Sequence, residues 1–320
     1  MDPLAVAANV DLMAAPRPSP DLLETHELRT RGPVSLHVRK DWLDALPVEA
    51  MLDGAPITAW GEPVEHDLAG RGEVHVLGTA AGEVVAKAYS RGGFIGGLLR
   101  HWYLDAGRPA REAEVSEGLS RLGCPTPPVV AFRATRSSSG LMYRLEIATA
   151  RVDGACDLLD ALRAARGDVD ALRALARGAG QTLRRLHDVG LHHSDLQVKN
   201  LLVPDSAPEG PFIVLDLDRC DLAQPLDRAE RVASLARFAR SLVKNGVLPG
   251  LGRSARPEQR HATRAFLTTY GALPDATRAA LAADVATRLK RSLRTHQLLW
   301  DDPDKKTPDE TSDGPAERAL

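Results

Sequence analysis

The residues best suited to chemistry lie in the segment 186–203, where His193, Asp195 and Asn200 stand in an H-x-D-L-x-x-x-N pattern. Phosphoryl transfer asks a protein for a carboxylate that orients an acceptor hydroxyl and takes its proton, and for oxygen ligands that hold Mg2+ against phosphates. Asp195 would be this carboxylate, and the side-chain carbonyl of Asn200 would be a metal ligand. The pattern therefore predicts a phosphoryl-transfer site.

A second acidic position follows a short distance along the chain. The apolar residues 212–215 lead directly into Asp216 and then Asp218, which is typical of a strand that ends in an acidic turn. The D-F-G segment of protein kinases has this position, and its aspartate binds Mg2+. We therefore expect Asp216 to be the second metal ligand. Each piece alone could be an ordinary turn, cap or strand end, but the ordered set favours a kinase-like site.

A nucleotide-binding hairpin is expected upstream, with strands at 70–77 and 82–89. Gly70 and Gly72 could belong to it, although two glycines near a strand more often mark a turn. Lys87 ends a V-A-K segment that resembles the kinase strand whose lysine pairs with the ATP phosphates. An exposed strand lysine is the alternative interpretation.

A helix is expected from about residue 109 to 122, where the chain reaches Gly123 and a proline cluster. In a kinase this helix supplies the acid that pairs with the strand lysine. Counting back from Gly123 favours Glu112 over Glu114, and either could instead be a solvated helix residue.

Two more strands, at 129–134 and 143–148, lead to a plausible hinge at 149–154. We expect the backbone groups of residues 146–148 to contact the adenine. Residues 169–187 have leucines and alanines at helical spacing and should form a core helix directly before the H-x-D loop.

A basic face is expected on the helix 226–245, where Arg237, Arg240 and Lys244 lie opposite the apolar positions. A solvated face is the default interpretation. The functional one is a surface for an anionic acceptor or an anionic lipid, because clustered Arg and Lys attract phosphates and lipid head groups.

Composition limits the possible classes of protein. The chain has 320 residues, 43% hydrophobic and 4% aromatic, and a net charge of −2, which argues against a basic protein that coats nucleic acid. Its three cysteines form no C-x-x-C pair and are expected to be reduced thiols. The sequence has no signal-peptide pattern and no long apolar run. We expect a cytoplasmic protein, or one attached to the cytoplasmic side of a membrane.

Four segments together resemble the lipopolysaccharide kinase family, and within it the kinases of 3-deoxy-D-manno-octulosonic acid (Kdo). These are the Y-S-R-G-G segment at 89–93, the H-S-D-L loop at 193–196, the acidic turn at 216–220 and the R-F-A-R-S-L-V-K helix at 237–244. The resemblance implies an α+β, protein-kinase-like fold of two lobes that uses ATP and Mg2+. It also implies phosphorylation of the 4-hydroxyl of a Kdo sugar on a lipid A precursor, at the inner face of the inner membrane of Gram-negative bacteria.

Carried over residue by residue, the resemblance implies that Asp195 is the catalytic base and that Asn200 and Asp216 bind Mg2+. It further implies that Lys87 contacts an ATP phosphate and that Glu112 is its partner.

The acceptor side is less closely matched. Arg91, Arg237, Arg240 and Lys244 are the candidates for binding an acceptor that carries a carboxylate and phosphates. The family usually has another Arg before the R-G-G segment, where this chain has Ser90. We expect a Kdo-lipid A precursor or a related glycolipid as acceptor, peripheral contact with an anionic membrane, no nucleic acid and no obligate protein partner.

The expected organisation is an N-terminal extension over 1–66, an N-lobe over 67–148, a C-lobe over 149–300 and a disordered tail over 301–320. Two alternative functions remain. One is another kinase of the same superfamily, acting on a small molecule such as an aminoglycoside or choline, or on Ser/Thr in proteins, although the chain lacks an A-P-E segment. The other is a pseudokinase, which the presence of all the expected catalytic residues disfavours.

Overall fold

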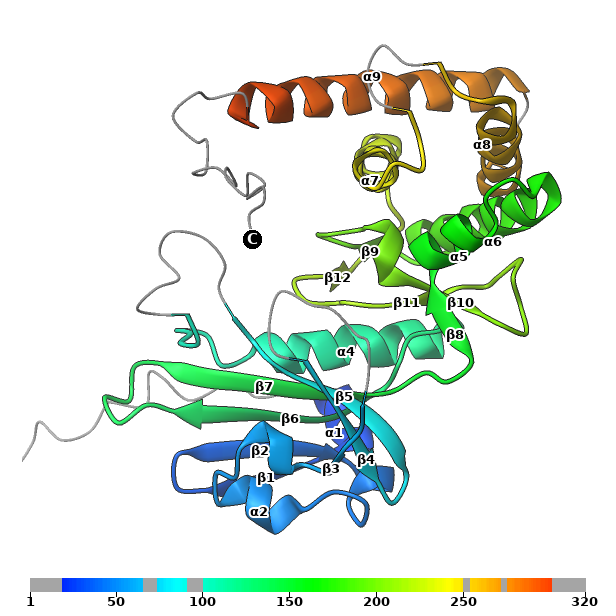
Figure 1. Ribbon diagram of the computed structural model, residues 1–320. Coiled ribbons are helices and arrows are strands. Elements are labelled where there is room, and N and C mark those ends of the chain that lie inside the picture. Colours follow the sequence, from blue (N-terminus) through cyan, green and yellow to red (C-terminus); the bar gives the residue numbers. More distant parts are fainter. Residues whose placement is uncertain (1–18, 66–73, 91–99, 250–253, 272–274, 301–320) are drawn as a thin grey trace, which may run out of the picture.

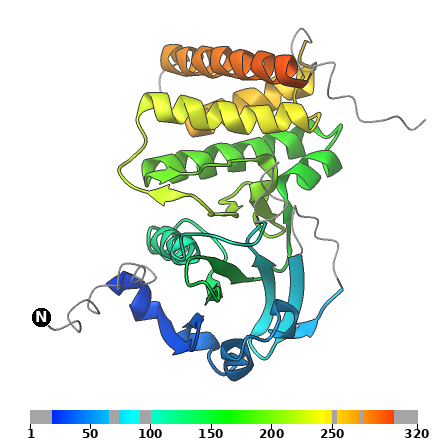
Figure 2. The ribbon, with the colours of Figure 1, turned by 90° about the vertical axis from the view of Figure 1, so that its left-hand side faces the viewer.

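A computed structural model of the chain describes residues 19–65, 74–90, 100–249, 254–271 and 275–300, without the side chains of 275 and 296–300. These residues form a mixed α/β structure. An antiparallel sheet lies at one end, helices from the second half of the chain stack at the other, and the helix Arg108–Arg121 (α4) with several short strands lies between them (Figures 1 and 2).

Seven strands of the described residues form one antiparallel sheet in the order β1-β2-β6-β7-β5-β4-β3. Their bounds are His26–Arg31 (β1), Val34–Arg39 (β2), Glu62–Pro63 (β3), Val74–Thr79 (β4), Gly82–Ala88 (β5), Val129–Arg136 (β6) and Tyr143–Ala150 (β7). The expected hairpin is present as β4 and β5, although Gly70 and Gly72 lie outside the described residues.

The first strands come from the part of the chain that we predicted to be an extension. β2 pairs with both β1 and β6, and β3 pairs with β4. Leu36, Met51 and Trp60 are fully buried in one hydrophobic cluster with Val84 of β5. This segment therefore contributes three strands and much of one core cluster to the sheet.

The first two helices pack at the sheet end of the molecule, and the later helices build the other end. The helices are Pro20–Thr25 (α1), Val48–Leu52 (α2), Arg108–Arg121 (α4), Leu158–Ala164 (α5), Val169–Asp188 (α6), Arg228–Lys244 (α7), Pro257–Tyr270 (α8) and Asp275–Trp300 (α9). Three 3-10 turns cover Lys40–Trp42 (η1), Ile57–Ala59 (η2) and Val198–Asn200 (η3). The short strands are Ala155–Asp157 (β8), Leu191–His192 (β9), Leu201–Pro204 (β10), Ile213–Val214 (β11) and Asp221–Leu222 (β12).

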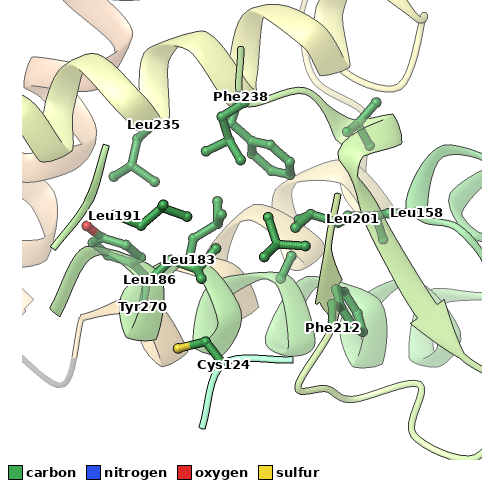
Figure 3. Packing of buried hydrophobic residues seen from close by; sticks show 14 of the residues in the cluster. Cys124, Leu158, Leu183, Leu186, Leu191, Leu201, Phe212, Leu235, Phe238 and Tyr270 are labelled. Atoms are coloured by element: carbon green, nitrogen blue, oxygen red, sulfur yellow. The ribbon is translucent and has the colours of Figure 1, made fainter. Parts of the chain in front are cut away.

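The largest hydrophobic cluster holds the helical end together (Figure 3). It includes Leu183 and Leu186 of α6, Leu201 of β10, Phe212 directly before β11, and Phe238 of α7. Because the apolar face of α6 is in this cluster, the helix gives a fixed support to the loop that follows it.

A buried histidine joins three of the helices. The ring nitrogens of His187 on α6 lie 2.7 Å from the Tyr270 hydroxyl on α8 and 2.8 Å from the Ser234 hydroxyl on α7. Burial lowers the pKa of His187 to about 3, so the ring is neutral at physiological pH. It holds α6, α7 and α8 together by hydrogen bonds.

The expected adenine contact at residues 146–148 is wrong. These residues lie in β7, which pairs with β5 on one edge and with β6 on the other. The backbone groups of a central strand are used in the ladders on both sides, so they cannot also bind a base. The chain leaves the sheet after Ala150, and residues 151–154 connect it to β8.

Within the described part of the chain, we find no helix that combines the length and the apolar character needed to cross a membrane.

Candidate active site

Three side chains from different elements meet at the junction between the sheet and the helical end. Nζ of Lys87 on β5 lies 3.6 Å from Oε1 of Glu112 on α4 and 3.4 Å from Oδ1 of Asp216, which follows β11. The structure therefore brings together the lysine and two acids that the sequence singled out in separate segments.

The structure also separates the two candidate glutamates of α4. Glu112 is 5% exposed and faces Lys87, whereas Oε1 of Glu114 accepts a hydrogen bond of 2.8 Å from the backbone N–H of Ser19. Residues two positions apart lie on opposite sides of a helix. Only Glu112 can therefore pair with Lys87.

The charges of this group depend on one another. Burial lowers the pKa of Lys87, but the carboxylates of Glu112, Asp216 and Asp218 outweigh burial and raise it above its usual value. Burial raises the pKa of Glu112, against the opposing effects of Lys87 and the Tyr89 hydroxyl, which donates a hydrogen bond to Glu112. Lys87 is thus a firmly protonated cation.

The H-x-D loop is fixed by its histidine. Nε2 of His193 donates to the carbonyl of Leu215 at 3.0 Å, so Nδ1 is the acceptor that receives the backbone N–H of Asp195 at 3.3 Å. Burial lowers the pKa of His193, which agrees with this neutral tautomer. The histidine therefore holds Asp195 in a set position relative to the strand that precedes the acidic turn.

Asp195 and Asn200, the two polar ends of the loop, have different surroundings. The Asp195 side chain is exposed, and its Oδ2 accepts a hydrogen bond of 2.7 Å from Gln197. Nδ2 of Asn200 donates to the carbonyl of Asp195 at 2.8 Å, so the amide nitrogen is engaged within the loop and the amide oxygen is the atom that could bind a metal ion.

The acidic turn is tied to the loop. The backbone N–H of Leu215 donates to the carbonyl of Asn200 at 2.9 Å, and the Ser194 hydroxyl donates to the carbonyl of Asp218 at 3.2 Å. Asp216 itself has φ of 57°, a conformation that is uncommon for residues other than glycine. Such backbone strain is often found at functional sites.

Arg108 is a site residue that the sequence did not reveal. Its guanidinium donates two hydrogen bonds to the carboxylate of Asp218, the one from Nε at 2.6 Å, and it lies 5.0 Å from the centre of the Tyr89 ring. The contact joins the first turn of α4 to the acidic turn, 110 residues later. No motif in the chain signals a contact over this separation.

The comparison with known families agrees with this geometry. Residues 59–270 match the lipopolysaccharide kinase (Kdo/WaaP) family. The chain belongs to this family.

Individual relatives point the same way. The chain is 32% identical over 179 residues to a protein of Photobacterium profundum named 3-deoxy-D-manno-octulosonic acid kinase, a match that covers 55% of this chain and 71% of the relative. Proteins with the same name from Actinobacillus succinogenes and Xylella fastidiosa are 30% and 31% identical, and the matches cover 67% and 72% of their lengths.

A solved structure, titled WaaP in complex with acyl carrier protein, is similar with a TM-score of 0.50 and 19% sequence identity. The similarity covers 78% of this chain and 96% of that chain. At this identity it shows the fold alone. This lipopolysaccharide kinase thus has the mixed α/β fold of WaaP.

The donors at this kinase site fit Mg2+. The described residues contain no group of three or more His, Cys, Asp or Glu side chains that could hold a metal ion by itself. Mg2+ usually keeps several waters and is bound by one or two protein side chains together with substrate phosphates. An amide oxygen of Asn200 and a carboxylate of Asp216 match that donor set.

The predicted acceptor residues have different surroundings in this family member. Arg237 is half-buried, and its guanidinium donates to the carbonyl of His193 at 3.0 Å, so it is not part of a solvated face. Arg240 donates to the Ser292 hydroxyl at 3.3 Å, Lys244 is exposed, and Arg91 lies outside the described residues.

Proposed function

We propose that this lipopolysaccharide kinase transfers the γ-phosphoryl group of ATP to the 4-hydroxyl of a Kdo sugar on a lipid A precursor. One observation carries the proposal: Lys87, Glu112 and Asp216 come from three separate elements and meet beside the H-x-D loop. The family and the names of the relatives add the acceptor class.

On the nucleotide side, Lys87 binds phosphate oxygens of ATP, and Glu112 holds the ammonium group in position. Asn200 and Asp216 are the residues that would hold Mg2+, which neutralises negative charge on the phosphates when it is bound. Because Asp216 lies within 3.4 Å of Lys87, one cluster can contact both the phosphates and the metal.

On the acceptor side, Asp195 orients the sugar hydroxyl and takes its proton. Two contacts support this role: the backbone of Asp195 is fixed by His193, and its carboxylate is exposed and bonded by Gln197. A fixed carboxylate reduces the entropy that the reaction must lose to align the hydroxyl.

The proposal includes a protein-kinase-like division into lobes. The sheet with α4 is the N-lobe, centred on residues 67–148 and extended by β1 to β3, and residues 149–300 are the C-lobe. In this arrangement the linker 151–154 contacts the adenine, instead of the strand residues before it. ATP lies between the two ends of the molecule in this arrangement.

We further propose that the protein works on the cytoplasmic side of the inner membrane, in peripheral contact with anionic lipids. This location follows from the acceptor class, because a lipid A precursor is anchored in the membrane. The positive charge of α7 and α9 supports contact with such a surface.

The test is phosphate transfer from radiolabelled ATP with Mg2+ to a panel of acceptors. The panel holds Kdo-lipid A precursor, free Kdo, an aminoglycoside, choline and a generic protein substrate, with Asp195→Asn as control. We expect label in the Kdo-lipid alone. Label in another compound of the panel would show that this compound, and not the Kdo-lipid, is the acceptor. ATP binding without any label would indicate a pseudokinase.

A further inference from the structure

The helices at the end of the chain concentrate positive charge. Residues 228–300 contain 14 Lys and Arg but 4 Asp and Glu, a net charge of +10 in a chain whose net charge is −2. The described acids of α7 and α9 are also engaged elsewhere: Glu230 caps the start of α7 and Asp284 pairs with Arg228 at 2.6 Å. A local excess of cations of this size attracts anions.

One of these cationic side chains, that of Arg237, contacts the H-x-D loop directly. Arg237 donates to the carbonyl of His193 at 3.0 Å, and the Ser241 hydroxyl, one turn further along α7, accepts the backbone N–H of Val198 at 2.9 Å. α7 therefore has a fixed position relative to Asp195.

α9 lies against α7 on the other side (Figures 1 and 2). Arg240 of α7 donates to the Ser292 hydroxyl of α9 at 3.3 Å. Arg288 precedes Ser292 by one helical turn, so both side chains leave α9 from the same face. This arrangement brings Arg288 to the side of α7 that carries Arg237 and Arg240.

The electrostatics agree with this placement. Burial lowers the pKa of Arg237, the like charges of Arg240 and Arg288 lower it further, and the carboxylate of Asp195 acts in the opposite direction. Arg288 is exposed, and the acids Asp284 and Asp188 beside these helices form their ion pairs with Arg228 and Arg231. Cations that lie close together are stabilised when an anion binds between them.

We propose that Arg288 of α9, with Arg237 and Arg240 of α7, forms an anion site for a second charged group of the acceptor, a carboxylate or a phosphate. The inference rests on the proposed function, because it assumes an acceptor whose hydroxyl lies at Asp195 and whose second charged group reaches the arginines. Guanidinium groups suit both anions, since their planar N–H donors match two oxygens at once. Arg288 is then a residue that determines acceptor specificity.

The experiment compares Arg288→Gln with Arg294→Gln in the full chain. Both changes remove one positive charge from α9, but Arg294 is exposed and points about 120° around the helix axis from Arg288. Kinetics are measured with Kdo-lipid A precursor dispersed in neutral detergent micelles. We expect Arg288→Gln to raise the KM for the acceptor about tenfold or more, because a charge-assisted bond is lost, while kcat and the KM for ATP stay unchanged. Arg294→Gln should match the wild type.

A second acceptor, the same glycolipid without its lipid A phosphates, identifies the anion. If Arg288→Gln still raises its KM, the group bound is the Kdo carboxylate; if the effect disappears, the group is a phosphate, and either result supports the site. Equal KM values for both variants and the wild type overturn the proposed anion site. Reduced binding of both variants to phosphatidylglycerol vesicles, with a normal KM in micelles, also overturns it, because that result indicates that the charges serve membrane docking. A wild-type protein that labels no Kdo acceptor refutes the proposed function, and this inference with it.

Discussion

Arg108 and Asp218 link the first turn of α4 to the acidic turn through two side-chain hydrogen bonds. Both side chains are largely buried, at 14% and 21% exposed. α4 also carries Glu112, and the acidic turn also carries Asp216, so this pair connects the two acids that surround Lys87. The position of the helix and the geometry of the proposed metal ligand are therefore coupled.

Arg108→Ala should damage both stability and turnover. The variant leaves the carboxylate of Asp218 partly buried without its partner, which costs about 2 kcal/mol or more in the free energy of unfolding, and it releases α4 from the turn. We expect kcat to fall about tenfold or more through misplacement of Asp216. Urea unfolding and steady-state kinetics measure the two effects.

The matched control for this change is Arg111→Ala on the same helix. Arg111 pairs with Asp105, and both side chains are more than half exposed, so the loss should be below about 1 kcal/mol. Equal effects of the two variants would show that the Arg108 contact has no special role.

Glu112→Gln should weaken the use of ATP. Without the carboxylate, Lys87 loses the partner that holds its ammonium group toward the phosphates, and kcat/KM for ATP should fall about tenfold or more. Glu114→Gln is the control, because Glu114 bonds the backbone of Ser19 instead. The role assigned to Glu112 is wrong if both variants retain the wild-type kcat/KM.

Short motifs made most of the site predictable. Lys87, Asp195, Asn200 and Asp216 each stand in a local segment whose spacing reflects a single piece of chemistry. The helix α4 was expected within one residue of its observed bounds, since its ends are marked by glycine and proline. Local signals therefore singled out Lys87, Glu112 and Asp216, which the structure brings together, while the functional roles of the site residues stay predictions.

Contacts between distant segments were not predictable in this way. β2 pairs with β6 about 100 residues later. Part of the segment that we expected to be an extension therefore forms strands of the sheet. Arg237 looked like a solvated residue, because the sequence does not show that a loop carbonyl lies above α7. The adenine contact failed for the same reason: whether a strand is central depends on which strands pair with it.

Asp195→Asn should abolish turnover while ATP binding survives. The carboxylate acts on the acceptor hydroxyl and not on the nucleotide, and removal of a general base typically costs about 100-fold to 10,000-fold in rate. Isothermal titration with a non-hydrolysable ATP analogue measures binding, and label transfer measures turnover. The exposed Asp160 on α5 supplies the control variant Asp160→Asn. A loss of nucleotide affinity in Asp195→Asn alone would contradict the assigned role.

His187 should make the protein less stable in mild acid. Its pKa is lowered by burial to about 3 from the usual 6.5, so the unfolded chain binds a proton more readily than the folded protein does. The stability that the neutral ring contributes is complete above pH 6.5 and is lost as the pH falls from 6.5 toward 3. The loss from this residue between about pH 7.5 and 5.5 should be about 1 kcal/mol.

Urea unfolding at these two pH values tests the prediction with His187→Gln and the control His261→Gln. His261 is exposed on α8, and its variant should keep the pH dependence of the wild type. His187→Gln loses the ring's hydrogen bonds to Tyr270 and Ser234, so it should be less stable than the wild type near pH 7.5. Its free energy of unfolding should fall less than that of the wild type on acidification. The buried His37, whose pKa burial lowers to about 4, and the buried His26 and His193, whose pKa values burial also lowers, contribute to the pH dependence that remains. An unchanged pH dependence in His187→Gln would mean that the folded protein protonates this ring as readily as the unfolded chain does, and the neutral bridge between α6, α7 and α8 would have to be abandoned.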